Sequence, residues 1–90
     1  MESRVTVIGI IVENPDSVEA VNALLHGCAP YILGRMGVPY RARGISIISI
    51  AMDAPQDVIN TLSGRLGKLP GVSAKAAYAR VSPAEGDAVQ

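Results

Sequence analysis

Apolar residues along this chain follow two periodicities, which predict strands and amphipathic helices. Nearly continuous Val and Ile runs at 5–12 and 45–52 are typical of strands, and the first resembles a strand buried on both faces. After each run, apolar residues recur at intervals of three and four, as on one side of a helix. These helical stripes are Val18, Val21, Leu24, Leu25 and Cys28, then Val58, Ile59, Leu62, Leu66 and Leu69.

Polar residues and glycines mark where the two helices begin and end. Asn14-Pro15 predicts the first start, because Asn caps helices and Pro suits the first helical position. Asp53 and Gln56 have the spacing of a capping box at the second start, with Asp in place of Ser or Thr. Gly27 and Gly67 are expected to end the two helices.

Two weaker strand patterns complete the set, at 32–41 and 72–81. Pro39 interrupts the first of these, and a proline cannot donate to a sheet ladder, so this strand is expected at an edge. The resulting order, β-α-β-β-α-β, predicts an α+β, ferredoxin-like domain with a four-stranded antiparallel sheet and both helices on one face. We expect one domain over 1–81 and a disordered tail over 82–90, which is small, polar and acidic.

The segment 8–18 is echoed forty residues later in the segment 48–58. Each copy is an apolar run, an acid, a proline and then a helical pattern. The echo supports two strand-helix units in tandem, with the two most apolar strands in the middle of the sheet.

The sheet face that the helices leave open is also predicted to be apolar. The first strand has Val5, Val7 and Ile11 on one face and further Val and Ile residues on the other. Shielding ~500 Å² of such surface per subunit is worth on the order of 12 kcal/mol before association costs. We therefore expect a homo-oligomer, a dimer or tetramer, joined through sheet faces or edges.

Composition narrows the classes of function. Eight Lys and Arg balance eight Asp and Glu, and this zero net charge argues against direct nucleic-acid binding and membrane binding. The single cysteine excludes an internal disulfide and a cysteine-based metal site, and indicates a reducing, cytoplasmic setting. No signal-peptide pattern begins the chain, and no apolar run approaches the roughly 20 residues that span a bilayer.

His26 and Cys28 are the first candidates for chemistry. Two positions apart on a helix, their side chains point ~200° away from each other, so they cannot chelate one ion together. Cys28 lies on the apolar stripe and is interpreted as a core residue. His26 lies off the stripe, as a surface or interface histidine or as a ligand contact across an oligomer.

Basic residues concentrate around the predicted edge strand. Arg35, Arg41 and Arg43 accompany Gly37 and Pro39, and arginine forks suit carboxylates and phosphates while glycines permit close backbone approach. These five residues are therefore a candidate ligand-binding segment. The alternative interpretation is an edge strand protected against aggregation by its charges and its proline.

The residue types of this chain do not indicate catalysis. One His, one Cys and scattered acids form no recognisable catalytic set, so we expect no enzyme and no cofactor. The segment 64–67 has two residues between its glycines and closes a helix, so it is no phosphate-binding P-loop. The two central strands lack the aromatic residues that stack on RNA bases.

Four short segments, in this order, resemble the iron-only hydrogenase system regulator family. They are Leu24-Leu25-His26, Arg35-x-Gly37-x-Pro39, Leu62-Ser63-Gly64-x-Leu66-Gly67 and Gly71-Val72, and the resemblance covers 4–81. It implies an ACT-like fold related to the C-terminal domain of nickel-responsive regulators, a homo-oligomer, and regulation through an effector bound between subunits. His26, Arg35, Gly37 and Pro39 match the family pattern, without an implied catalytic role.

The chain departs from nickel-responsive regulators in two respects. A single His cannot supply their histidine-rich metal site, and no DNA-binding arm precedes the first strand, so neither nickel sensing nor DNA binding is expected. We expect a non-enzymatic regulatory module whose small-molecule effector or protein partner binds near His26 and the 35–43 segment. The alternatives are a small dimeric α+β-barrel enzyme that uses His26, and a structural partner subunit that caps an edge strand.

Overall fold

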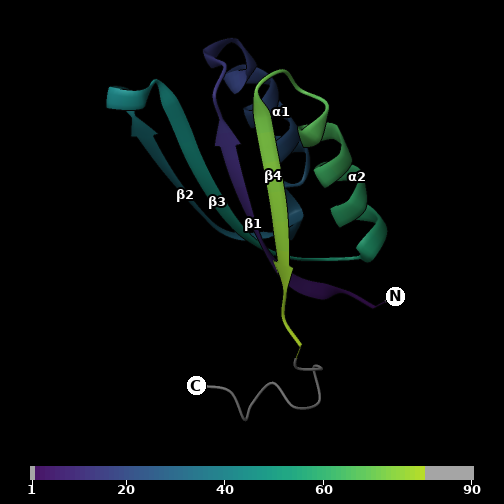
Figure 1. Ribbon diagram of the computed structural model, residues 1–90. Helices are drawn as coiled ribbons and strands as arrows, with labels where there is room; N and C mark the ends of the chain where they lie inside the picture. The colour runs from purple at the N-terminus through teal and green to yellow at the C-terminus, as the bar shows by residue number, and fades with distance from the viewer. Residues whose placement is uncertain (1, 81–90) are drawn as a thin grey trace.

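The structure, a computed structural model, describes residues 2–80 as one antiparallel sheet with two helices on one face (Figure 1). The predicted domain end at 81 and the predicted tail lie outside the described residues. No helix within residues 2–80 is long and apolar enough to cross a membrane. The main elements are β1 (Arg4–Val12), α1 (Val18–Gly27), β2 (Ile32–Tyr40), β3 (Ile45–Ala54), α2 (Gln56–Gly67) and β4 (Val72–Tyr78).

The order of the strands across the sheet is β2-β3-β1-β4. β1 pairs with β3 and with β4, and β2 pairs with β3, all antiparallel. The two most apolar strands therefore lie in the centre, and the strand that contains Pro39 lies at an edge. This arrangement confirms the predicted ferredoxin-like plan.

The core lies between the helices and the facing side of the sheet. Alternate residues of β1 point into it, whereas Val5, Val7 and Ile11 on the other side are 46%, 45% and 39% exposed. The prediction that this strand is buried on both faces is thus wrong for the single chain, because the helices form only one layer. The core residues are Ile8, Ile10, Val12, Val21, Leu25, Ile48, Ile50, Met52, Ala54, Ile59, Leu62, Leu66 and Val72.

The two helices begin differently from one another. Asn14 caps as predicted, since its Oδ1 accepts a hydrogen bond of 2.9 Å from the amide of Asp16, but a single 3₁₀ turn precedes α1. The capping box predicted for α2 is wrong. Asp53 remains in β3, paired with Val5, and α2 starts at Gln56 after an extended proline without a side-chain cap.

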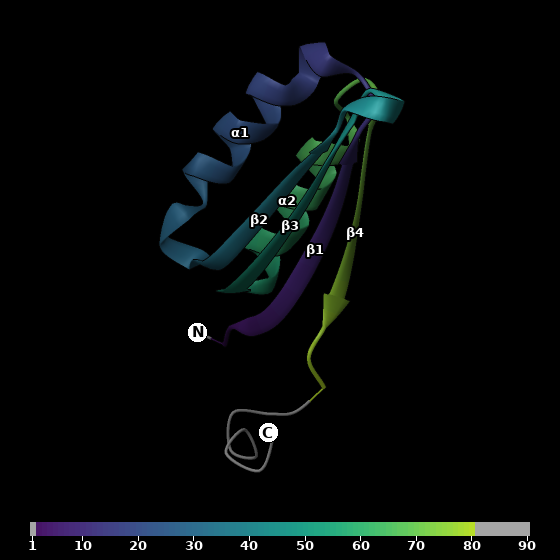
Figure 2. The same cartoon turned by 90° about the vertical axis from the view of Figure 1, so that its left-hand side faces the viewer.

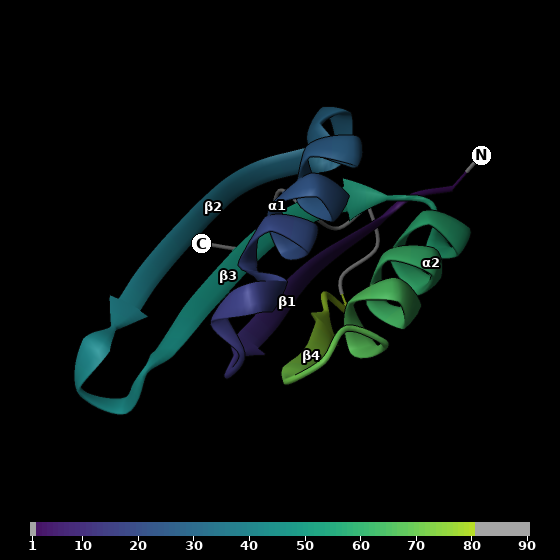
Figure 3. The same ribbon diagram turned by 90° about the horizontal axis from the view of Figure 1, so that it is seen from above.

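A β-bulge interrupts β2 near its start. Ile32 pairs with Met52 and Gly34 with Ala51, which leaves Leu33 as one extra residue. The bulge shifts the alternation, so that Arg35 faces the helix side and Met36 faces the open side. No residue of β2 is buried, and its far end, with β3, extends beyond both helices (Figure 3).

Candidate functional site

The uncovered face of the sheet gathers the exposed apolar side chains. Figure 2 shows both helices on one side of the sheet and no element of the described chain on the other. All the large hydrophobic side chains found exposed in residues 2–80 belong to β1 and β2. We call this surface the open face, and its members are Val5, Val7, Ile11, Leu33, Met36, Val38 and Tyr40.

A second feature is a hollow of about 240 Å³ between α1 and β2. Arg35, Gly37 and Pro39 line it from β2, because the bulge turns these alternate residues toward the helix side. The Arg35 guanidinium donates a hydrogen bond of 2.6 Å to Oδ1 of Asn22 on α1. The hollow thus holds an oriented cation beside a glycine, at the edge of the sheet.

The remaining predicted residues occupy two other places. His26 is exposed in the last turn of α1, four residues after Asn22, so it lies on the same side of α1 as the partner of Arg35. Arg41 and Arg43 form the 3₁₀ turn at the tip of the β2–β3 hairpin. Because a strand rises about 3.3 Å per residue, this tip lies about 20 Å from Arg35. The structure therefore brings Arg35, Gly37 and Pro39 to one hollow, and it places the two tip arginines outside this hollow and far from Arg35.

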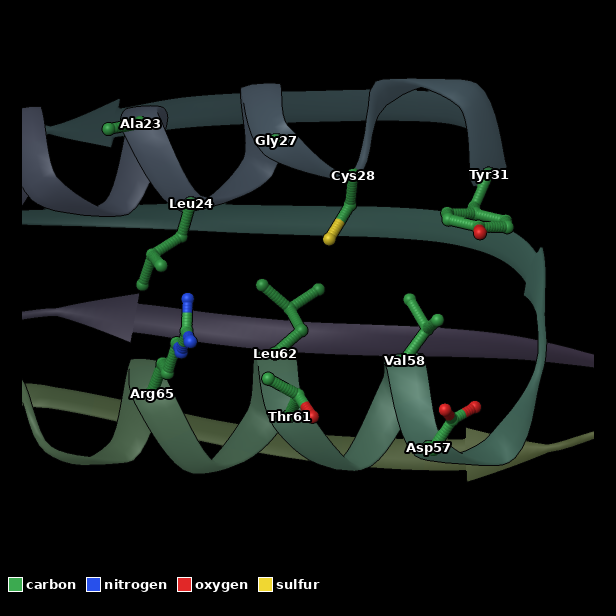
Figure 4. Close-up of a pocket in the computed structure, with 10 residues that line it drawn as sticks. All are labelled: Ala23, Leu24, Gly27, Cys28, Tyr31, Asp57, Val58, Thr61, Leu62 and Arg65. Atoms are coloured by element: carbon green, nitrogen blue, oxygen red, sulfur yellow. The ribbon is translucent and has the colours of Figure 1, made fainter.

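The third feature is a groove of about 380 Å³ between α1 and α2, which we call the interhelical groove. Residues four apart build its walls, since such residues form rows along a helix. Ala23 and Gly27 form a row of small residues on α1, and Val58 and Leu62 form an apolar row on α2. Figure 4 shows the side chains of both helices turned toward the space between them. The complete lining is Ala23, Leu24, Gly27, Cys28, Tyr31, Asp57, Val58, Thr61, Leu62 and Arg65.

Polar groups of the interhelical groove come mainly from one row of α2: Asp57, Thr61 and Arg65. Cys28, half-buried at the end of α1, is packed against the core and also lines the groove. Burial raises the pKa of the Cys28 thiol, and the positive charge of Arg65 partly offsets this rise. The prediction that Cys28 belongs to the core is therefore incomplete, because its side chain also lines the groove.

Sequence reasoning missed this groove. Its polar row has a readable signal, since residues 57, 61 and 65 are spaced by four directly beside the apolar stripe of α2. Whether such a row lines a groove depends on the distance between the helices, which the spacing leaves open. Within residues 2–80, no three His, Cys, Asp or Glu side chains are gathered as a metal site would require.

Strand order and a single helix layer define a domain of the ferredoxin-like fold, the fold that ACT-like domains share. Within this class, the chain belongs to the TM1266-like family, whose model matches residues 4–76 and is described as "Iron-only hydrogenase system regulator, putative". The resemblance seen in the sequence is thereby confirmed.

Two solved structures extend the comparison. The uncharacterized protein TM1266 from Thermotoga maritima is 34% identical, with a TM-score of 0.84, over 88% of this chain and 100% of that chain. A formyltetrahydrofolate deformylase from Pseudomonas putida KT2440 is 15% identical, with a TM-score of 0.62, over 88% of this chain and 30% of that chain. The second likeness shows the fold alone. No curated protein matches the chain.

Proposed function

We propose that this protein is a non-enzymatic regulatory module of an iron-only hydrogenase system, and that it works as a homo-oligomer joined through its open face. The family description supports the regulatory role. The observation that carries the assembly is the open face itself. In the described chain, the exposed large hydrophobic side chains gather on this one surface instead of being scattered.

The exposures of these side chains support burial against a second copy. They range from 39% for Ile11 to 68% for Leu33, on a sheet face that lacks a helix layer. A standard interface buries about 800 Å² per partner, a size that the face of a four-stranded sheet can supply. Removing the apolar part from water, ~500 Å² per subunit, contributes on the order of 12 kcal/mol before association costs.

A small effector or a protein partner would regulate such an oligomer by binding one assembly state better than another. The hollow lined by Arg35, Gly37 and Pro39 supports such a role, because its guanidinium is already oriented by Asn22. His26, on the same side of α1, belongs to this proposed effector region. The tip arginines, Arg41 and Arg43, are proposed as a separate contact for an anionic partner.

Light scattering of the purified protein at micromolar concentration tests the assembly. We expect a mass that is a multiple of the 9.4 kDa chain. Val7→Lys and Val38→Lys each place a charge on the open face and should give monomers, since an unpaired charge is costly to bury. Gly64→Lys is the matched control, because Gly64 lies exposed on α2 with open space beside it.

A monomeric wild-type mass would contradict the proposed assembly, provided that circular dichroism shows each sample folded. The regulatory role has its own test in cells with an iron-only hydrogenase. Loss of this chain should change hydrogenase activity, Gly64→Lys should restore it and Val7→Lys should not. Unchanged activity after loss would contradict the regulatory role and leave the oligomer standing.

A further inference from the structure

We propose that the interhelical groove is a binding site for a small monocarboxylate with an elongated apolar body, whose carboxylate pairs with Arg65. This site lies on the helix layer, away from the open face. The proposal depends on the single chain and not on the proposed oligomer.

The groove has the size and lining of a small-molecule site. Its volume of about 380 Å³ falls at the lower end of the range of roughly 300–1,000 Å³ that ligand pockets occupy. Leu24, Val58 and Leu62 supply apolar walls. On α1, Ala23 and Gly27 carry almost no side chain toward the groove, so space remains between the helices where larger residues would fill it.

Arg65 supplies the charge that selects the ligand's head group. Its guanidinium extends across the groove toward Leu24, above the apolar lining (Figure 4). Among residues 2–80, no side-chain hydrogen bond occupies it. A planar guanidinium beside apolar surface matches a carboxylate in both geometry and charge. Its positive charge lowers the pKa of Cys28 against the larger rise caused by burial, as expected for two groups that line one groove.

The other end of the groove determines that the ligand carries one carboxylate and not two. Asp57 and Tyr31 lie there, and the Asp57 carboxylate would repel a second anionic group. Arg65 and Asp57 are eight residues apart on α2, which separates them by about 12 Å along the helix axis. An apolar body of that length would lie over Val58 and Leu62, between the two charges.

Cys28 provides a built-in reporter for the test, because it is the only cysteine of the chain and lines the groove. Octanoate is the probe, octanamide has the same apolar body with a neutral head group, and propionate has the same head group as octanoate without the body. We expect octanoate to slow alkylation of Cys28 saturably, relative to the rate of each variant without ligand. Octanamide and propionate should have little effect.

Arg65→Gln should weaken octanoate binding about tenfold or more, because it removes a charge-assisted hydrogen bond. Arg43→Gln is the matched control, since the same change at the hairpin tip lies outside the groove. Calorimetric titration measures the affinities independently of the thiol. The proposal is overturned if octanoate shows no saturable binding, if octanamide protects Cys28 equally, or if Arg65→Gln binds octanoate like the wild type.

Discussion

Two glycines of this chain should respond oppositely to the same substitution. Gly71 has a φ of +69°, and a Cβ there would come within 2.8 Å of the Asn14 Cβ and 2.9 Å of the Asn14 amide nitrogen. Gly71→Ala should therefore destabilise the fold by about 2 kcal/mol or more. Gly64 lies inside α2 with open space around it, so Gly64→Ala should stabilise by about 1 kcal/mol.

Urea unfolding of both alanine variants at one protein concentration measures these two free-energy changes. The comparison separates the effect of the left-handed backbone conformation at Gly71 on stability from the effect of adding a methyl group. Equal shifts of the unfolding midpoint in the two variants would contradict the role assigned to the left-handed conformation of Gly71.

The thiol of Cys28 should ionise at a higher pH than an exposed cysteine. Burial favours the neutral thiol and raises the pKa, while Arg65 favours the thiolate and lowers it. The rate of alkylation against pH should therefore have its midpoint above the ordinary value, and Arg65→Gln should move it higher still. The protein unfolded in urea serves as the reference. A midpoint that falls in Arg65→Gln would contradict this reading of the groove's electrostatics.

Three elements are joined at the start of β1 by one polar cluster. The Arg4 guanidinium lies 4.2 Å from the centroid of the Tyr78 ring and donates a hydrogen bond of 2.7 Å to Oε1 of Gln56. Nε2 of Gln56 donates in turn to the Tyr78 hydroxyl, at 2.9 Å. The cluster ties β1, β4 and the start of α2 together.

Arg4→Ala should destabilise the fold by roughly 1 kcal/mol, because it removes an exposed cation–π contact and one hydrogen bond. Tyr78→Phe should cost less, since the ring remains under the guanidinium. Urea unfolding measures both, with Arg43→Ala at the hairpin tip as the control, because it makes the same change away from the cluster. A loss in Arg43→Ala as large as in Arg4→Ala would show that the cluster adds nothing specific.

At the scale of elements, much of the fold could be predicted from the sequence because periodicity and edge signals are local. The stripes through Val21, Leu25, Ile59 and Leu66 marked the buried sides of the helices, and Pro39 marked an edge strand. The start of α2 could not be predicted as well. Capping-box spacing is short and common, and pairing with β1 kept Asp53 in the sheet.

For the whole molecule, folding and association should be coupled. If the open face is covered by a second copy, dissociation precedes or accompanies unfolding, and mass action stabilises the folded oligomer. The urea midpoint of the wild type should therefore rise with protein concentration. The midpoint of Val7→Lys should not, since that variant is expected to be monomeric. A wild-type midpoint independent of concentration would argue against an obligate assembly.

The candidate site was less predictable than the fold because it depends on how elements pack. Arg35, Gly37 and Pro39 could be selected together, since they share one strand, and the structure places them in one hollow. The predicted strands at 32–41 and 45–52 already put Arg41 and Arg43 at the turn between them, and the structure shows that this turn lies away from Arg35. The interhelical groove depends on the spacing of two helices that are distant in sequence.

The extra residue at Leu33 is in effect a phase shift between two periodic patterns. Upstream of it, the strand follows one alternation, and downstream it follows the opposite one. A β2 of the same length that paired regularly from Ile32, without the bulge, would have its two rows exchanged. Its arginine would then stand among the apolar residues of the open face, and Met36 would take its place beside Asn22. Deletion of Leu33 should instead leave Arg35 beside Asn22, because Gly34 would then follow Ile32 in regular pairing and the register after it would not change.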